Sequence, residues 1–150
     1  MISDFYGNQL TTSTGLARDS YDIGLRAFLS ANYGAQEAFS QAIEADPNFT
    51  LAYLGLARAF MSSGQIADAK AAIGKAKNLL KGATDREKSH FLCCELLLLG
   101  EAKKARTAVQ NHVSEWPRDA IIAQMSTSVF GLIGFSGERG RENDLLEYTA

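Results

Sequence analysis

The stretch TLAYLGLARAFMSSGQIADAKAAIGKAK, from Thr50 to Lys77, holds two runs of helical spacing on either side of a small-residue turn. Apolar residues recur every three or four positions in both runs, which places them on one face of each helix. In the second run, Gly64 is followed by Ala69, Ile73 and Ala76. The alanines let a partner helix approach closely, and the isoleucine fills the space beside them. The stretch predicts a helix, a tight turn and a second helix.

The same spacing recurs twice, once before and once after this stretch. Gly100 is followed by small and apolar residues at the same intervals as Gly64, and Ser30 begins a similar series. The period is 34 to 36 residues, and proline ends the second helix of the first and third copies. The residues expected to pack the repeats are Ala35, Phe39, Ala42, Pro47, Gly64, Ala69, Ile73, Ala76, Gly100, Ala105, Val109 and Pro117.

Composition indicates an all-α protein. The chain has 150 residues, of which 46% are hydrophobic and only 2 are proline, and strand-like alternation is absent. A polar lead-in over residues 1–13 is expected before a repeat domain over 14–150, with units at 14–47, 48–82, 83–117 and 118–150. Helices are predicted at 14–30, 33–46, 49–63, 65–80, 84–99, 101–115, 118–133 and 139–149. Thr12, Ser13 or Thr14 is expected to cap the first helix, and Thr84 begins a capping sequence for the fifth.

These units resemble the tetratricopeptide repeat, a helix-turn-helix unit of about 34 residues. The resemblance implies a right-handed α-α superhelix of about 3.5–4 repeats. The segments DFYGNQLTTST, AFSQAIEADPNFTLAY, REKSHF and AQMSTSVFGLIGFSGERGRE are similar to the tetratricopeptide repeat protein 38 family. Members of that family are several hundred residues long, which implies that this chain is an N-terminal part. The resemblance supplies no catalytic residues.

Tetratricopeptide arrays bind partners on a concave surface lined by the first helix of each unit. The lining expected from the repeat phase is mostly apolar and sparse in charge, which suits a protein or peptide partner. In a longer chain, its own N-terminal tail or later repeats could fill the groove. We therefore expect a non-catalytic scaffold without a cofactor. The groove residues expected are Tyr21, Leu25, Leu54, Arg58, Met61, His90, Cys94, Gln124 and Ser128.

A second hypothesis is a small-molecule-binding or enzymatic domain. His90 and Cys94 lie four residues apart on one helix face and form a conceivable nucleophile and base, or two metal ligands. Two ligands are too few for a structural zinc site, and His112 joins them only if the fold allows it. Glycines recur every third position from Gly131 to Gly140, but the Lys-Ser/Thr pair of a phosphate loop is missing. Close helix packing and a turn explain these glycines better.

Charge and hydropathy limit the remaining classes of function. The net charge is −2, and the lysines Lys70, Lys75, Lys77 and Lys81 read as a solvated convex face rather than a nucleic-acid surface. No apolar run is long enough to span a membrane, and no signal peptide is visible. The adjacent Cys93 and Cys94 are expected to be reduced thiols in a cytoplasmic protein. Self-association through the apolar end near Leu145 is an alternative to a longer natural chain.

Overall fold

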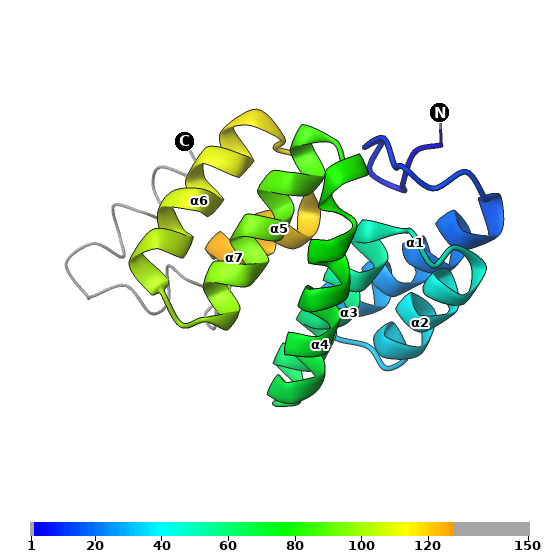
Figure 1. Cartoon of the computed structure of the whole chain (residues 1–150), viewed down its shortest axis with the longest axis horizontal. Coiled ribbons are helices and arrows are strands. Elements are labelled where there is room, and N and C mark those ends of the chain that lie inside the picture. The colour runs from blue at the N-terminus through cyan, green and yellow to red at the C-terminus, as the bar shows by residue number, and fades with distance from the viewer. Residues whose placement is uncertain (1, 128–150) are drawn as a thin grey trace.

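The structure is a computed structural model that describes residues 2–127 (Figure 1). Helices α1 to α6 begin and end within two residues of their predicted bounds, and α7 begins within two residues of its predicted start. The predicted helix at 139–149, Ser128 and the Gly131–Gly140 segment lie outside the described residues. The elements are α1 (Gly15–Leu29), α2 (Ala35–Ala45), α3 (Thr50–Ser62), α4 (Ile66–Asn78), the short 3-10 helix η1 (Leu80–Gly82), α5 (Asp85–Leu98), α6 (Ala102–Glu115) and α7 (Ala120–Thr127).

The helices form successive helix-turn-helix pairs, α1–α2, α3–α4 and α5–α6, and α7 begins the next one (Figure 1). Each pair packs internally and against its neighbour, as α2 does on α3 and α4 does on α5. The described residues contain no strand, and an isolated bridge joins Ser3 to Gln9. The all-α class and a tetratricopeptide-like superhelix are therefore confirmed. The array also curves enough for α7 to contact α1.

Local sequence signals explain where the helices begin and end. The Thr14 side chain accepts a hydrogen bond from the Ala17 amide at 3.0 Å and caps α1. Thr84 and Glu87 form a reciprocal capping box at the start of α5. Gly64 and Gly100, which follow α3 and α5, have φ values of 74° and 73°. This left-handed conformation strains a residue with a side chain, so glycine suits both turns.

Phe39 of α2 lies at the centre of the first core. Its ring is fully buried and contacts Tyr21, with ring centroids 5.7 Å apart. A methyl group added to Gly24 of α1 or Gly55 of α3 would lie 2.7 Å or 2.5 Å from the ring, closer than atoms can pack. The two glycines therefore let three helices converge on one aromatic ring. Among the residues expected to pack the repeats, those buried are Ala35, Phe39, Ala42, Ala69, Ile73, Ala76, Ala105 and Val109.

The polar lead-in, residues 2–13, reaches across the repeats. Thr12 donates a hydrogen bond to Asp46 at 2.7 Å, at the end of α2. Thr11 donates to Glu87 of α5 at 2.9 Å, and the Asn8 side-chain amide donates to the Arg118 carbonyl at 2.8 Å. These contacts join the first unit to the third and to the start of the fourth. The lead-in is thus an ordered strap across the array.

Candidate functional site

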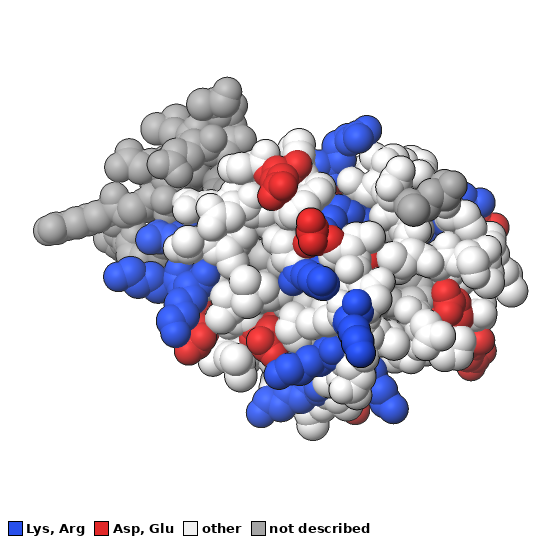
Figure 2. Space-filling view, turned by 45° about the horizontal axis from the view of Figure 1, so that its top comes forward, with Lys and Arg blue, Asp and Glu red and all other residues white. Residues whose placement is uncertain are grey.

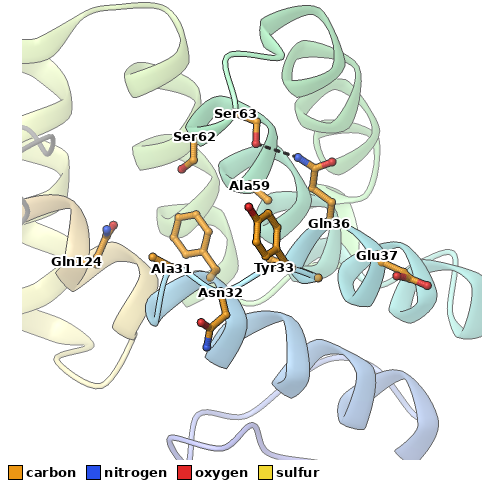
Figure 3. Close-up of a pocket in the computed structure, with 12 residues that line it drawn as sticks. Ala31, Asn32, Tyr33, Gln36, Glu37, Ala59, Ser62, Ser63 and Gln124 are labelled. Carbon is orange, nitrogen blue, oxygen red and sulfur yellow. Dashed lines mark hydrogen bonds between the residues drawn. The ribbon is translucent and has the colours of Figure 1, made fainter.

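A pocket of about 690 Å³ opens where α1, α3 and α7 come together (Figure 3). The turn from α1 to α2 and the first turn of α2 form one wall, and the last turn of α3 forms another. Phe28 and several alanines supply apolar surface. Amide and hydroxyl side chains, among them those of Gln36, Ser62 and Ser63, also line the pocket (Figure 3). The lining residues are Phe28, Ala31, Asn32, Tyr33, Gly34, Ala35, Gln36, Glu37, Ala59, Ser62, Ser63 and Gln124.

The turn beside this pocket has an unusual backbone and an exposed aromatic ring. Ala31 has a φ of 55°, and Gly34 has a φ of 100°. Tyr33 between them is fully exposed. Gln36 donates hydrogen bonds to Ser63 at 3.1 Å and to Gln65 at 2.9 Å, and so fixes the start of α2 against the α3–α4 turn. These hydrogen bonds therefore fix one wall of the pocket, and an aromatic side chain is exposed at its rim.

Arg58 of α3 connects this pocket to the interior. Its guanidinium donates to the Gln124 side chain at 3.1 Å and lies 5.4 Å from the centre of the Phe28 ring. Its Nε atom is buried without a hydrogen-bond partner, and no carboxylate among residues 2–127 pairs with it. Burial lowers the pKa of Arg58, and the nearby Cys94 acts in the opposite direction.

A second feature is a buried polar cluster centred on Asp119, just before α7. One carboxylate oxygen of Asp119 lies 2.8 Å from His90 Nδ1, 2.9 Å from His112 Nε2 and 3.0 Å from an Arg86 nitrogen. All four side chains are less than a tenth exposed. Arg86 also donates to the Gln9 carbonyl at 3.0 Å. The cluster thus ties α5, α6, the α6–α7 turn and the strap to one carboxylate.

The two histidines of the cluster differ in charge. Burial works to lower the pKa of His90, but the Asp119 carboxylate and Cys94 together outweigh it and raise that pKa to about 10. Burial lowers the pKa of His112. A neutral His112 donates from Nε2 to Asp119 and accepts at Nδ1 from the Ser89 hydroxyl, 2.8 Å away. His90, His112 and Arg86 overcome the effect of burial on Asp119 and lower its pKa.

The cluster meets the geometric condition for a metal site, but its contacts favour hydrogen bonding. His90 Nδ1, His112 Nε2 and an Asp119 oxygen lie within 4.8 Å of one another. Arg86 already donates to the same oxygen at 3.0 Å, and its permanent positive charge would repel a divalent cation there. The two imidazole nitrogens also need their protons to bond to the carboxylate. We therefore interpret the cluster as a network of ion pairs and hydrogen bonds.

The structure exposes some of the residues expected in the groove and buries others. Arg58, Met61 and Gln124 are partly exposed. Gln124 lines the pocket, and Arg58 bonds to it. Five other expected groove residues are buried and line no open surface: Tyr21, Leu25, Leu54, His90 and Cys94. This correction has two physical causes. Tyr21 packs against the rings of Phe39 and Phe49, and α5 packs against α3, α4 and α6.

Sequence reasoning did not single out Asp119 or Arg86, and it treated His112 as remote. The four cluster residues come from α5, α6 and the turn before α7, and Asp119 is 29 residues from His90. No local signal in the sequence marks Asp119 as the centre of a cluster. Asp119 follows Pro117 at the turn into a new helix, a position where an acidic residue is ordinary, so only the fold reveals its partners.

The molecular surface carries mixed charge. Figure 2 shows basic and acidic side chains interspersed on the face in view, with basic groups gathered towards the bottom, where α4 lies in Figure 1. The α4 lysines are exposed, and Lys77 lies 3.9 Å from Glu95. Exposed pairs of this kind contribute little to stability. The lysines fit the expected solvated face.

Comparison with known proteins supports the repeat assignment. Residues 34–84 match the family model described as Tetratricopeptide repeat. That segment runs from the start of α2 to the residue before α5 and includes the whole stretch from Thr50 to Lys77 that predicted the fold. This match and the helix-turn-helix packing of the described residues support a tetratricopeptide-like fold. No curated protein and no solved structure matches it.

The part of the chain that the structure describes contains no helix that is both long and apolar enough to cross a membrane.

Proposed function

We propose that this protein is a non-catalytic binding module whose pocket between α1, α3 and α7 holds a segment of a protein partner. The pocket itself carries this proposal. Tetratricopeptide repeats generally mediate protein–protein interaction, and the matched segment, residues 34–84, supplies most of the pocket wall. The partner is another protein or, in a longer chain, a segment of the same protein.

The chemistry of the lining favours an extended, largely uncharged peptide. Asn32, Gln36 and the hydroxyls of Ser62 and Ser63 can bond to peptide N–H and C=O groups. Phe28 and Ala59 offer apolar surface for one side chain. The exposed ring of Tyr33 can close over the bound segment, and aromatic side chains of this kind are enriched at interfaces.

A peptide library displayed on phage, selected against the 150-residue chain, tests this function. Ser62→Arg places a long charged side chain in the pocket mouth. Ser114→Arg is its matched control, because Ser114 is an exposed serine in the last turn of α6 and does not line the pocket. We expect selected peptides to lose at least about tenfold in affinity with Ser62→Arg and to bind Ser114→Arg normally. Equal binding to both variants would refute the pocket as the binding site.

We further propose a relationship to the tetratricopeptide repeat protein 38 family and a cytoplasmic location. Two of the segments that carry the resemblance, DFYGNQLTTST and REKSHF, meet in space: Arg86 bonds to Gln9, and Thr11 to Glu87. This contact gives a structural reason for the two segments to occur together in one family. Two buried free thiols, Cys93 and Cys94, support a reducing compartment.

A further inference from the structure

We propose that the outer face of α1 is a self-association surface, on which a second copy of this chain packs antiparallel. The surface is centred on four exposed residues, which we call the α1 stripe: Leu16, Asp19, Ile23 and Arg26. None of them lines the pocket, so this inference goes beyond the proposed binding function and does not depend on it.

The first observation is that α1 exposes an apolar stripe on the side away from its own core. Leu16 is 71% exposed and Ile23 is 55% exposed. Successive members of the α1 stripe are three, four and three residues apart, which is the spacing of helices that pair lengthwise. The end helix of a repeat array normally has a polar outer face, and this one does not. The residues of α1 that face the core are Ala17, Ser20, Tyr21, Gly24 and Leu25.

The strap adds a fixed aromatic ring to this surface. The strap and the first unit lie at one end of the array (Figure 1). The Phe5 amide donates a hydrogen bond to Asp22 of α1 at 2.8 Å, and the Phe5 ring is 60% exposed. The Arg26 guanidinium lies 5.0 Å from the centre of that ring. Exposed aromatic and arginine side chains are enriched at protein interfaces, and here they stand together with the apolar stripe.

The order of charges along α1 favours a second, antiparallel copy as the occupant. The acidic Asp19 precedes the basic Arg26 by about two helical turns. A twofold axis reverses this order in the partner copy, so that Asp19 of each copy comes beside Arg26 of the other and the apolar residues meet between them. A parallel copy would bring like charges together. Asp19 is available for this contact, because its bond to Arg18 uses one carboxylate oxygen and its side chain is 65% exposed.

The length of the stripe limits the strength of the dimer. Leu16 and Arg26 are about 15 Å apart along the axis, at a rise of about 1.5 Å per residue. A contact between two such helices buries less than the roughly 1,200 Å² of a stable complex. We therefore expect a reversible dimer with a Kd on the order of 10–100 µM.

Charge reversal tests the proposal by sedimentation velocity of the 150-residue chain, from about tenfold below to about tenfold above that Kd. Asp19→Arg sets two cations against each other across the axis, and Arg26→Asp sets two anions against each other. We expect each variant alone to lose at least about tenfold in dimer affinity, and an equal mixture of the two to recover it, because both charge pairs are then complementary. Lys70→Asp, an exposed change of the same charge on α4, is the matched control and is expected to dimerise normally.

The other outcomes would overturn the proposal. A chain that stays monomeric over the whole range has no second copy on α1. A dimer equally strong in both variants and the control forms elsewhere on the molecule, and weakened variants that do not recover on mixing contradict the antiparallel pairing. Folding is checked by circular dichroism. Should a charge variant not fold, Ile23→Gln decides, because it removes apolar surface at an exposed position without changing charge, and it too is expected to weaken the dimer.

Discussion

At the scale of single residues, the packing around Phe39 requires two positions without a side chain. Gly24 and Gly55 approach its buried ring from two helices, and neither position has room for a methyl group. Glycine is normally a poor helix former, by about 1 kcal/mol relative to alanine. Its presence in the middle of α1 and α3 is explained by this contact.

Replacing Gly55 by alanine therefore has a predictable sign. The gain in helix propensity is about 1 kcal/mol, but overpacking against a fixed ring costs about 1–3 kcal/mol. We expect Gly55→Ala to lower the free energy of unfolding, measured by urea denaturation. Gly74→Ala is the matched control, because Gly74 lies exposed in the middle of α4 with open space around it. That variant should gain stability, and a gain of the same size for Gly55→Ala would contradict the contact with Phe39.

His90 gives the protein a distinct pH dependence. Its pKa is about 10 in the folded state against an ordinary value of about 6.5. The folded chain therefore keeps a proton that the unfolded chain loses. Stability from this group is complete below pH 6.5 and is lost as the pH rises towards 10, by at most about 1.4 kcal/mol per pH unit.

Urea denaturation at pH 6.5, 7.0 and 7.5 measures this slope before cysteine, tyrosine and lysine titrate. We expect the free energy of unfolding to fall across the series. Added salt should change the slope little, because the group is buried. A flat or rising profile would show that the Asp119 carboxylate does not hold the His90 proton.

At the scale of the helix, α5 shows how one local signal serves two purposes. Glu87 accepts from the Thr84 amide at 2.8 Å with one carboxylate oxygen, which completes the capping box. Its other oxygen accepts from Thr11 at 2.9 Å. The start of α5 is therefore fixed both by its own sequence and by the strap.

Thr84→Ala removes the side-chain half of the capping box. We expect it to cost about 0.5–2 kcal/mol of unfolding free energy, as N-cap threonines usually do. Thr107→Ala is a suitable comparison, because Thr107 is exposed within α6 and bonds only to the Lys103 carbonyl of its own helix. The two variants are compared by thermal melting, and equal melting temperatures would refute the role of the cap.

At the scale of the whole molecule, the strap and the Asp119 cluster hold distant repeats together. A solenoid normally relies on contacts between neighbouring repeats. Here the strap reaches Asp46, Glu87 and Arg118, and Arg86 joins it to the cluster. The third unit therefore depends on residues that precede the first.

Removing residues 2–12 tests this dependence. We expect the shortened chain to melt at a lower temperature, and the third unit to lose more than the second. Trp116, the only tryptophan, reports on the third unit, because its ring lies 5.0 Å from that of His112. A tryptophan transition that stays at the temperature of the intact chain would show that the strap is dispensable.

Much of the fold was predictable because its causes are local. Helical spacing, Gly64 and Gly100 at the turns, and the Thr84 capping sequence all act within a few residues, so the described helices lie where the sequence placed them. The candidate site was less predictable. Gln124 was expected at the groove and lines the pocket, where Arg58 bonds to it, whereas Tyr33 and the α1–α2 turn were not foreseen as its wall.

By itself, the sequence determined the helices and their repeat, since both follow from side-chain periodicity and capping. Only the tertiary structure decided which faces stay open. The contact of α7 with α1 depends on the summed curvature of the repeats, and the packing of α5 against α3, α4 and α6 accompanies the burial of His90 and Cys94, which were expected in the groove. Buried polar groups must then find partners, and Asp119, Arg86 and His112 do so across long sequence distances. That requirement becomes visible only when the helices are packed.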